Sequence, residues 1–233
     1  MEWIQKNVIP SYMRWFCNRC DLVFAPSAGM QQVIREYGVD TPAAVFPTGL
    51  DGAFFRKDVR RSQEIRKQYS RGKRHLLVTV SRLEKEKNYG FLLRGIAELR
   101  QELGDEFHVL IIGDGSQKSA LKVRASILGI QDVVTFMGNI PNDQVKDYLG
   151  AADVFLFASK SETQGIVLAE ALAAGIPVVA VHATGTDDII EDGVNGFLTE
   201  EREEVWAAKV IEALVEEKNC GMKSAALGSA EKY

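Results

Sequence analysis

The order of five short apolar runs is the clearest structural signal in this chain: HLLVTVS (75–81), FHVLIIG (107–113), DVVTFMG (132–138), DVFLFAS (153–159) and PVVAV (177–181). Most of these runs are continuously apolar, which is typical of parallel strands that helices cover on both faces. The longer segments between them carry apolar residues at helical spacing, as Phe91, Leu92, Ile96 and Leu99 do. Helices are predicted over 88–103, 116–128, 142–149, 165–174 and 203–217. This alternation predicts an α/β fold with a doubly wound parallel sheet.

Residues 1–50 read as the end of a different unit. DLVFAPS (21–27) and AAVFPTG (43–49) predict two strands with a helix over 28–37 between them, a single βαβ repeat. Residues 51–74 are charged and poor in strand signals, so they are interpreted as a connector with one amphipathic helix. Its charge run from Arg56 to Lys67, which includes Lys57, reads as a solvated face. The helical pattern stops without a cap after Tyr233, and we expect a segment of a longer protein.

Composition excludes several classes of protein. The 233 residues are 46% hydrophobic, with 28 Lys and Arg against 32 Asp and Glu. This apolar share fits a packed core rather than disorder. The slight excess of negative charge creates no electrostatic attraction for the phosphates of a nucleic acid. The longest apolar stretches fall short of the ~20 residues of a membrane span, and MEWIQKNVIP lacks the apolar core of a signal peptide. These features predict a soluble, cytoplasmic protein.

The three cysteines do not indicate a disulfide scaffold. Cys17 and Cys20 have the spacing of half a zinc site or of a redox pair. No second pair follows them, and they lie in an aromatic, helix-like run. We interpret them as small apolar helix residues.

Ligands of open α/β sheets bind beyond the carboxyl ends of the strands, so the loops SRLEKEK (81–87), GDGS (113–116) and SKSETQG (159–165) are the candidate positions. Gly113 and Gly115 do not complete a dinucleotide fingerprint, because the third glycine would fall at Lys118. A P-loop is absent from the sequence as well. The two glycines indicate a tight strand-to-helix turn, and a close approach of its backbone to a ligand stays open.

Two carboxylates flank a predicted helix start at Gln164 and Gly165. A helix N-terminus attracts phosphate, and Glu170, roughly 8 Å further along the axis, leans back toward it. With Glu162 ahead of the phosphate position, the pair could hold the two hydroxyl-bearing ends of a diphosphate-linked ligand. The structural alternative is that Glu162 caps the helix and that Glu170 is partly buried and bonded to backbone.

A basic loop follows the first strand. Arg82 offers a bidentate fork and Lys87 a point charge, and both would neutralise a diphosphate if the sheet brought them toward Gly165. Taken alone, this loop reads as a mixed-charge surface loop.

Together these residues resemble the retaining, nucleotide-sugar-dependent glycosyltransferases with two Rossmann-like domains, the GT-B fold of glycosyl transferases group 1 or family 4. The matching segments occur in the same order over residues 20–200. They are VSRL with KN (80–88), LIIGDG (110–115), VTFMG (134–138), AADV (151–154), ETQG with EALAAGIPVV (162–179) and EDGVNGFL (191–198).

The resemblance implies roles for these residues. Arg82, Lys87 and Glu162 would be the catalytic residues, with the two cations on the donor diphosphate and Glu162 facing the donor sugar. Glu170 would hold the ribose, and the 136–140 loop would flank the base. The full set of implied substrate-binding residues is Arg82, Lys87, Gly113, Gly138, Glu162, Thr163, Gln164, Gly165, Ile166 and Glu170, where the amides of Gly165 and Ile166 would contact the phosphates. No metal or other cofactor is implied.

The resemblance also implies a domain organisation. Residues 1–50 would be the remnant of an acceptor-binding domain, 51–74 a connector and 75–200 the Rossmann-like domain that binds the nucleotide-sugar donor. Residues 201–233 would be truncated C-terminal helices. A hydroxyl acceptor, lipid or saccharide, would bind through the preceding domain, so this segment alone would bind donor without turnover. The full-length protein could associate peripherally with the inner face of the membrane.

The implied reaction transfers a glycosyl group, with UDP-glucose as the type of donor, to a hydroxyl with retention of configuration, in glycolipid or polysaccharide biosynthesis. Gln164, where many members have Phe, resembles a lipid-acceptor subgroup that includes diacylglycerol glucosyltransferases. Two alternatives stay open. A nucleotide-sugar epimerase has the same architecture, and a non-catalytic nucleotide-sugar-binding module would look like this segment.

Overall fold

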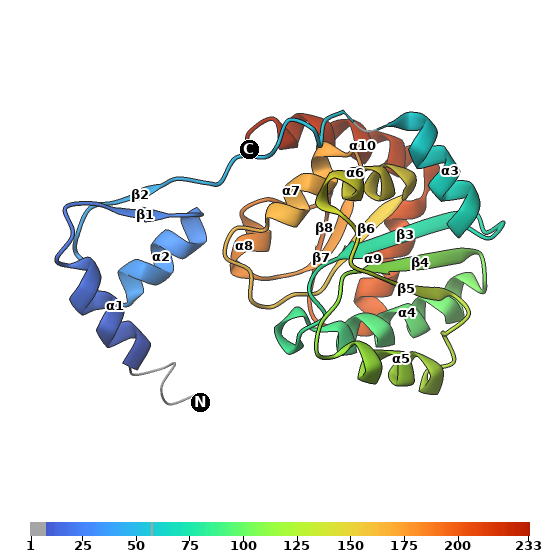
Figure 1. Cartoon of the computed structure of the whole chain (residues 1–233), viewed down its shortest axis with the longest axis horizontal. Coiled ribbons are helices and arrows are strands. Elements are labelled where there is room, and N and C mark those ends of the chain that lie inside the picture. Colours follow the sequence, from blue (N-terminus) through green and yellow to red (C-terminus); the bar gives the residue numbers. More distant parts are fainter. Residues whose placement is uncertain (1–7, 57) are drawn as a thin grey trace.

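The structure is a computed structural model that describes residues 8–56 and 58–233. Lys57, in the charge run of the connector, and residues 1–7, which belong to the N-terminal segment without a signal peptide's apolar core, lie outside the described residues. Within them, no helix combines the length and apolarity needed to cross a membrane. The described chain forms a two-stranded unit from its N-terminal part and a six-stranded unit that holds the remaining strands (Figure 1).

The larger sheet is parallel, in the order β5-β4-β3-β6-β7-β8. Its strands are β3 (His75–Val80), β4 (Phe107–Ile112), β5 (Val134–Gly138), β6 (Val154–Phe157), β7 (Val178–Val181) and β8 (Gly196–Thr199). The chain builds outward from β3 to β5 and then returns to place β6 on the other side of β3. The sheet therefore reverses its direction of growth between β3 and β6, where open α/β sheets bind ligands.

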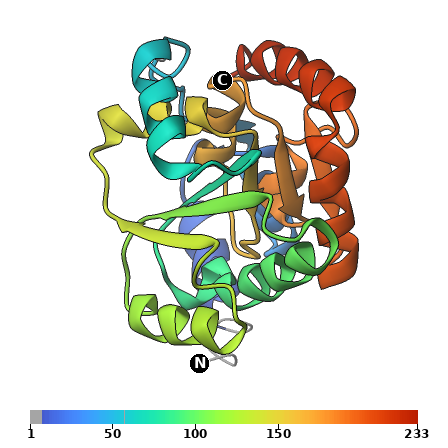
Figure 2. The same cartoon turned by 90° about the vertical axis from the view of Figure 1, so that its right-hand side faces the viewer.

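Helices cover both faces of this sheet, as its apolar strands predict (Figure 2). One face packs against α4 (Tyr89–Leu103), α5 (Lys118–Ile127) and α9 (Glu203–Leu214). The other packs against α3 (Val59–Tyr69), α6 (Asn142–Ala151), α7 (Ile166–Ala173) and most of α10 (Glu216–Ala230). Successive strand residues serve opposite layers: Leu77 is buried under α4 and α9, and Leu76 and Val78 lie in the other layer. The predicted doubly wound α/β fold is confirmed.

The two-stranded unit consists of α1 (Ile9–Cys17), β1 (Val23–Ala25), α2 (Ala28–Glu36) and β2 (Ala43–Val45). β1 and β2 pair in parallel, which confirms the predicted βαβ repeat. The buried apolar core of this unit is small, with Cys17, Ala25, Ile34 and Val39. Cys17 ends α1 and is buried, which raises the pKa of its thiol, whereas Cys20 lies in the turn beyond the helix. The predicted domain boundaries stay predictions.

Three elements differ from the sequence prediction. The strand β8 and the short helix α8 (Thr184–Asp187) carry no periodicity long enough to have been predicted. The helix predicted over 203–217 is interrupted at Val215, whose backbone is extended, with φ −63° and ψ 124°, so that α9 ends and α10 begins there.

Candidate functional site

A cavity of about 400 Å³ opens at the carboxyl ends of β3 and β6. The two strands are hydrogen-bonded neighbours, with Leu77 opposite Val154 and Val78 opposite Phe155, so the loops that follow them meet. Eight of the ten predicted site residues line this cavity: Arg82, Lys87, Glu162, Thr163, Gln164, Gly165, Ile166 and Glu170. The sheet thus brings together residues that are separated by more than 70 positions in the sequence.

Lys87 and Glu162 form an ion pair at the cavity. Lys87 Nζ lies 3.0 Å from Glu162 Oε2, and the two side chains are only 14% and 16% exposed. Glu162 therefore does not cap α7, which was the structural alternative, because Gly165 occupies the cap position and no side chain caps the helix. Lys87 ends the short helix η2 (Lys85–Lys87) and precedes Asn88, a left-handed residue with φ 54°. The Asn88 amide donates to Glu201 Oε1 at 2.8 Å, which anchors the turn that presents Lys87.

The N-terminus of α7 is shaped by Gly165. This residue has φ 70°, and a Cβ there would lie 2.9 Å from the carbonyl oxygen of Gly185. Both facts require glycine. No side chain caps α7. The N–H groups of its first turn therefore border the cavity without a capping side chain bonded to them.

Glu170 faces the same cavity from the next turn of α7. Burial raises the pKa of its carboxyl to about 7. In the described part of the chain, its carboxylate makes no hydrogen bond or ion pair, so the expected alternative of a bond to backbone is not found. The cavity therefore contains a carboxylate whose acceptor capacity is unused.

Arg82 lies at the rim. Its side chain is 74% exposed, and Nη2 is 3.4 Å from Glu86 Oε1, which is a weak, solvated contact. The neighbouring Ser81 is held more firmly, because its Oγ lies 2.8 Å from the hydroxyl of the buried Tyr89. The guanidinium is thus free to turn toward a ligand while the backbone that carries it is fixed.

Gly113 and Gly138 do not line the cavity. They face each other across β4 and β5, where the Gly113 N–H donates to the Gly138 carbonyl at 2.8 Å. A Cβ on Gly113 would lie 1.9 Å from the carbonyl oxygen of Ser81, so this glycine allows the end of β4 to lie against the loop that begins at Ser81. The turn interpretation of Gly113 is thereby supported. Ligand contact by Gly113, Gly138 and the 136–140 loop stays a prediction.

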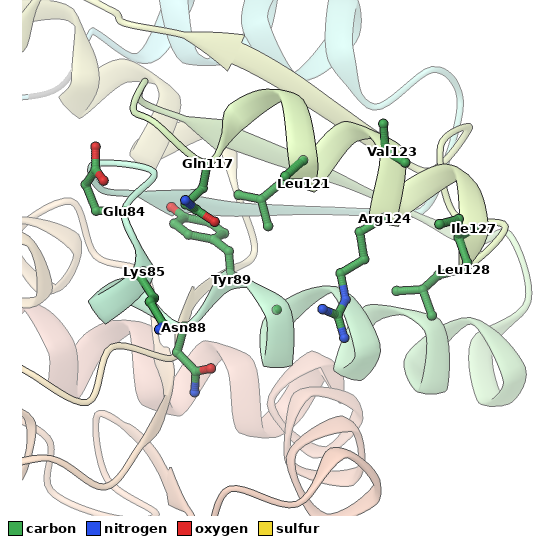
Figure 3. A pocket seen from close by; sticks show the side chains of 12 residues that line it. Glu84, Lys85, Asn88, Tyr89, Gln117, Leu121, Val123, Arg124, Ile127 and Leu128 are labelled. Carbon is green, nitrogen blue, oxygen red and sulfur yellow. The ribbon is translucent and has the colours of Figure 1, made fainter.

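The sequence did not reveal two features near the site. The Gln164 side-chain amide donates to the carbonyl of Thr48 at 3.0 Å, which links the cavity to the segment after β2. A second, larger cavity of about 590 Å³ lies between α4 and α5, bordered by Leu121, Arg124 and Tyr89 (Figure 3). Tyr89 lines this second cavity and bonds to Ser81 of the first, so it belongs to the wall between them.

The fold and the site together define an α/β unit of the Rossmann-like type that presents cations, a helix N-terminus and carboxylates at its topological switch point. The family comparison agrees. Residues 61–228 match the model for glycosyl transferases group 1, and residues 2–54 match the model for glycosyltransferase family 4. The chain belongs to the glycosyl transferases group 1 family.

Two similar curated proteins support the same family assignment. The alpha-monoglucosyldiacylglycerol synthase of Streptococcus pneumoniae is 32% identical over 217 residues, which cover 91% of this chain and 48% of the relative. The GDP-mannose-dependent alpha-(1-6)-phosphatidylinositol monomannoside mannosyltransferase of Mycobacterium tuberculosis is 28% identical over 236 residues, 98% of this chain and 60% of the relative. This chain therefore spans about half to three-fifths of the length of these two relatives.

Solved structures share the fold. Anabaena HepE in complex with UDP-glucose superimposes with a TM-score of 0.81 at 27% identity, covering 94% of this chain and 61% of that one. The sucrose-phosphate synthase of Thermosynechococcus elongatus gives a TM-score of 0.84 at 18% identity, over 94% of this chain and 55% of that one. The predicted GT-B resemblance is confirmed at the level of fold and family.

Proposed function

We propose that this chain is the donor-binding part of a retaining glycosyltransferase that transfers a sugar from a UDP-sugar to a hydroxyl group. One observation carries the proposal: Arg82, Lys87, the N-terminus of α7 and Glu170 converge on a single cavity at the switch point of the sheet. Two cations and a helix N-terminus suit a diphosphate, and a carboxylate one turn away suits a ribose diol. The UDP-glucose complex of the structurally similar HepE supports the choice of donor.

The proposed chemistry uses this chain's residues for binding and electrostatic stabilisation. The bond between the anomeric carbon and the diphosphate oxygen breaks, and the acceptor oxygen bonds to that carbon on the same face. The acceptor proton passes to the departing phosphate. Lys87, Arg82 and the α7 N-terminus stabilise the charge that develops on this diphosphate, a role that needs no metal.

The two carboxylates divide the remaining tasks. Glu162 holds the Lys87 ammonium in place before the ligand arrives, at 3.0 Å, and faces the donor sugar. Glu170, with no partner in the described residues, accepts hydrogen bonds from the ribose hydroxyls. Because burial raises its pKa to about 7, donor binding strengthens as the pH rises through neutrality and the carboxylate ionises.

The acceptor is proposed to be a lipid, bound with the help of the preceding acceptor domain that the family resemblance implies. Both relatives described above are named for reactions on lipids, a diacylglycerol and a phosphatidylinositol. Peripheral contact with a membrane follows from a lipid acceptor as part of the same proposal.

The test is a calorimetric titration of this chain with UDP, with GDP as the comparison. UDP binding that is lost in Arg82→Ala, while Arg60→Ala on α3 retains it, would support the assignment of the cavity. Glu170→Gln is expected to weaken uridine and UDP alike, because the ribose contact is shared. A preference for GDP would show that the donor is a GDP-sugar and not a UDP-sugar. Binding of neither nucleotide would contradict the proposal.

Turnover is tested in an N-terminally extended protein. Transfer of glucose from UDP-glucose to diacylglycerol, with the α-anomer retained, is the expected result. Donor binding without transfer to lipid or saccharide would favour the non-catalytic module, and interconversion of UDP-sugars would favour the epimerase.

A further inference from the structure

The loop that carries Glu162 is also the place where the two-stranded unit touches the six-stranded unit. Ser27 Oγ donates a hydrogen bond to the carbonyl of Thr163 at 2.8 Å. The side-chain amide of Gln164 donates to the carbonyl of Thr48 at 3.0 Å. Two consecutive residues of the cavity wall are thereby bonded to the two-stranded unit at Ser27 and to the segment that follows β2 at Thr48.

A second set of contacts lies beside these bonds. The Gly29 N–H donates to Asp188 Oδ2 at 3.0 Å, which places the first turn of α2 against α8. A Cβ on Gly29 would lie 2.5 Å from Thr184 Cγ2 and 3.1 Å from the Thr184 carbonyl oxygen, so any side chain here would force the neighbouring Thr184 to move. We call the whole set the interunit junction. On one side it contains Ser27 and Gly29 of the two-stranded unit and Thr48 of the segment that follows β2, and on the other Thr163, Gln164, Thr184 and Asp188.

The interunit junction and the cavity share the same backbone. Thr163 and Gln164 line the cavity between Glu162 and Gly165. The carbonyl of Glu162 accepts a hydrogen bond from the N–H of Gly185 in α8 at 3.1 Å, so α8 contacts this loop as well. On its inner side the same loop is held by the ion pair between Glu162 and Lys87. A displacement of the two-stranded unit would therefore pull on the loop that positions Glu162.

Gln164 is the residue best placed to transmit such a displacement. It is buried, and its amide is bonded to a carbonyl that belongs to the segment leaving β2. A buried amide that loses its hydrogen-bond partner lowers the stability of the folded state. The Gln164 side chain and Thr48 therefore stay bonded. The bond joins residues that are 116 positions apart in the sequence.

We propose that Gln164 is a positioning residue that couples the interunit junction to the nucleoside-diphosphate cavity. Its bond to Thr48 holds the loop from Ser161 to Gly165 in the shape that binds the ligand. Ligand binding and closure of the junction then favour each other, as a reciprocal coupling requires. This inference rests on the proposed function, because it concerns the same cavity.

Two variants test the coupling from opposite sides. Gln164→Leu keeps a buried side chain of similar size and removes the donor to Thr48. Gly29→Leu leaves the cavity untouched and inserts a side chain between α2 and Thr184. The control is Gly221→Leu in α10, where an added Cβ meets nothing within 4 Å. UDP is the probe, its Kd is measured by calorimetry, and hydrogen exchange is followed over residues 43–50 with and without UDP.

We expect both variants to raise the Kd for UDP about three- to tenfold, while Gly221→Leu leaves it unchanged. In Gln164→Leu the cause is the loss of one buried hydrogen bond, and in Gly29→Leu it is the side chain that separates α2 from Thr184. UDP should slow exchange over residues 43–50 in the wild-type chain and in Gly221→Leu but not in the two junction variants. That second readout separates coupling from a purely local defect of the cavity.

The outcomes distinguish the two proposals. UDP binding to the wild-type chain with an unchanged Kd in Gly29→Leu and Gln164→Leu, or without any change in exchange over residues 43–50, would overturn the coupling and leave the proposed function standing. Absence of UDP binding to the wild-type chain would overturn both. If Gln164→Leu failed to fold, Gly29→Leu would decide by the same criteria.

Discussion

The six-stranded unit and the two-stranded unit differ in how far they bury their apolar side chains. The larger unit buries two apolar layers, one on each face of its sheet. Among its described residues, the smaller unit buries four apolar ones and leaves Tyr12, Trp15, Phe16, Phe24 and Phe46 between 51% and 70% exposed. Apolar area removed from water is the main source of stability, so the larger unit is expected to carry the stability of the chain. The smaller unit, with little buried apolar area of its own, is expected to depend on contacts outside its own core.

The largest effect should come from the core of the six-stranded unit. Trp206 is fully buried, stacks edge-on against Phe91 with ring centroids 6.2 Å apart, and packs against the face of α4 at Gly95. Trp206→Ala should lower the free energy of unfolding by about 3–5 kcal/mol, measured by urea unfolding. A loss below about 1 kcal/mol would mean that this layer does not dominate the stability of the chain.

A smaller effect is expected at the ion pair that faces the cavity. Lys87→Met removes the cation and leaves Glu162, 16% exposed, without its partner at 3.0 Å. Stability should fall by about 2–3 kcal/mol, and UDP binding should be lost with it. The matched control is Lys85→Met, two residues earlier, because Lys85 borders the other cavity. Equal loss of UDP binding in both variants would argue against a specific role for Lys87.

Glu170 should make the stability of the larger unit depend on pH. Its folded-state pKa of about 7 lies above the ordinary 4.5, so between these values the folded state retains a proton that the unfolded state has lost. Stability is then highest below pH 4.5, falls as the pH rises to 7 and levels off above it. Glu170→Gln should remove this fall, which is about 2 kcal/mol after a discount for the partial exposure of the carboxyl.

Urea unfolding of the wild-type chain and Glu170→Gln at several pH values measures this fall. The two proteins should converge at about pH 4, below the unfolded-state pKa of 4.5, and differ near pH 8. A difference that stays constant over this range would contradict the raised pKa.

The smallest effect should come from the exposed rings of the two-stranded unit. Phe24 and Phe46 contact each other with ring centroids 5.6 Å apart but are 61% and 70% exposed. Phe24→Ala should change the free energy of unfolding of this chain by less than about 0.5 kcal/mol. The same substitution in an N-terminally extended protein sharpens the comparison, because a loss of about 2 kcal/mol there would show that the preceding chain covers these rings.

Much of the fold followed from local patterns. Five of the six strands of the larger sheet are apolar runs bounded by polar or glycine residues, and burial on both faces leaves no other favourable state for them. β8 was missed because Gly196–Thr199 is only four residues long and begins with glycine. The break at Val215 was missed because neither glycine nor proline marks it, and the turn is set by how α9 and α10 pack.

The sequence predicted most of the residues that line the candidate site, but not how they are arranged. Arg82, Lys87, Glu162 and Glu170 were found because each lies at a strand end or on a helix start where a charge needs a partner. Gly113 and Gly138 were grouped with them, yet the structure places these glycines outside the cavity, on the β4 and β5 side of β3. The bond from Gln164 to Thr48 had no local signal, since it joins residues 116 positions apart.

The sequence by itself determined the strands, the class of fold and the charged residues that face the switch point, because these depend on periodicity and on the cost of burying polar groups. Only the tertiary structure decided which loops meet. β4 follows β3 along the chain, but β6 is the neighbour that brings Glu162 to Lys87. Strand order depends on how helices of both layers pack together, and no short stretch of sequence contains that information.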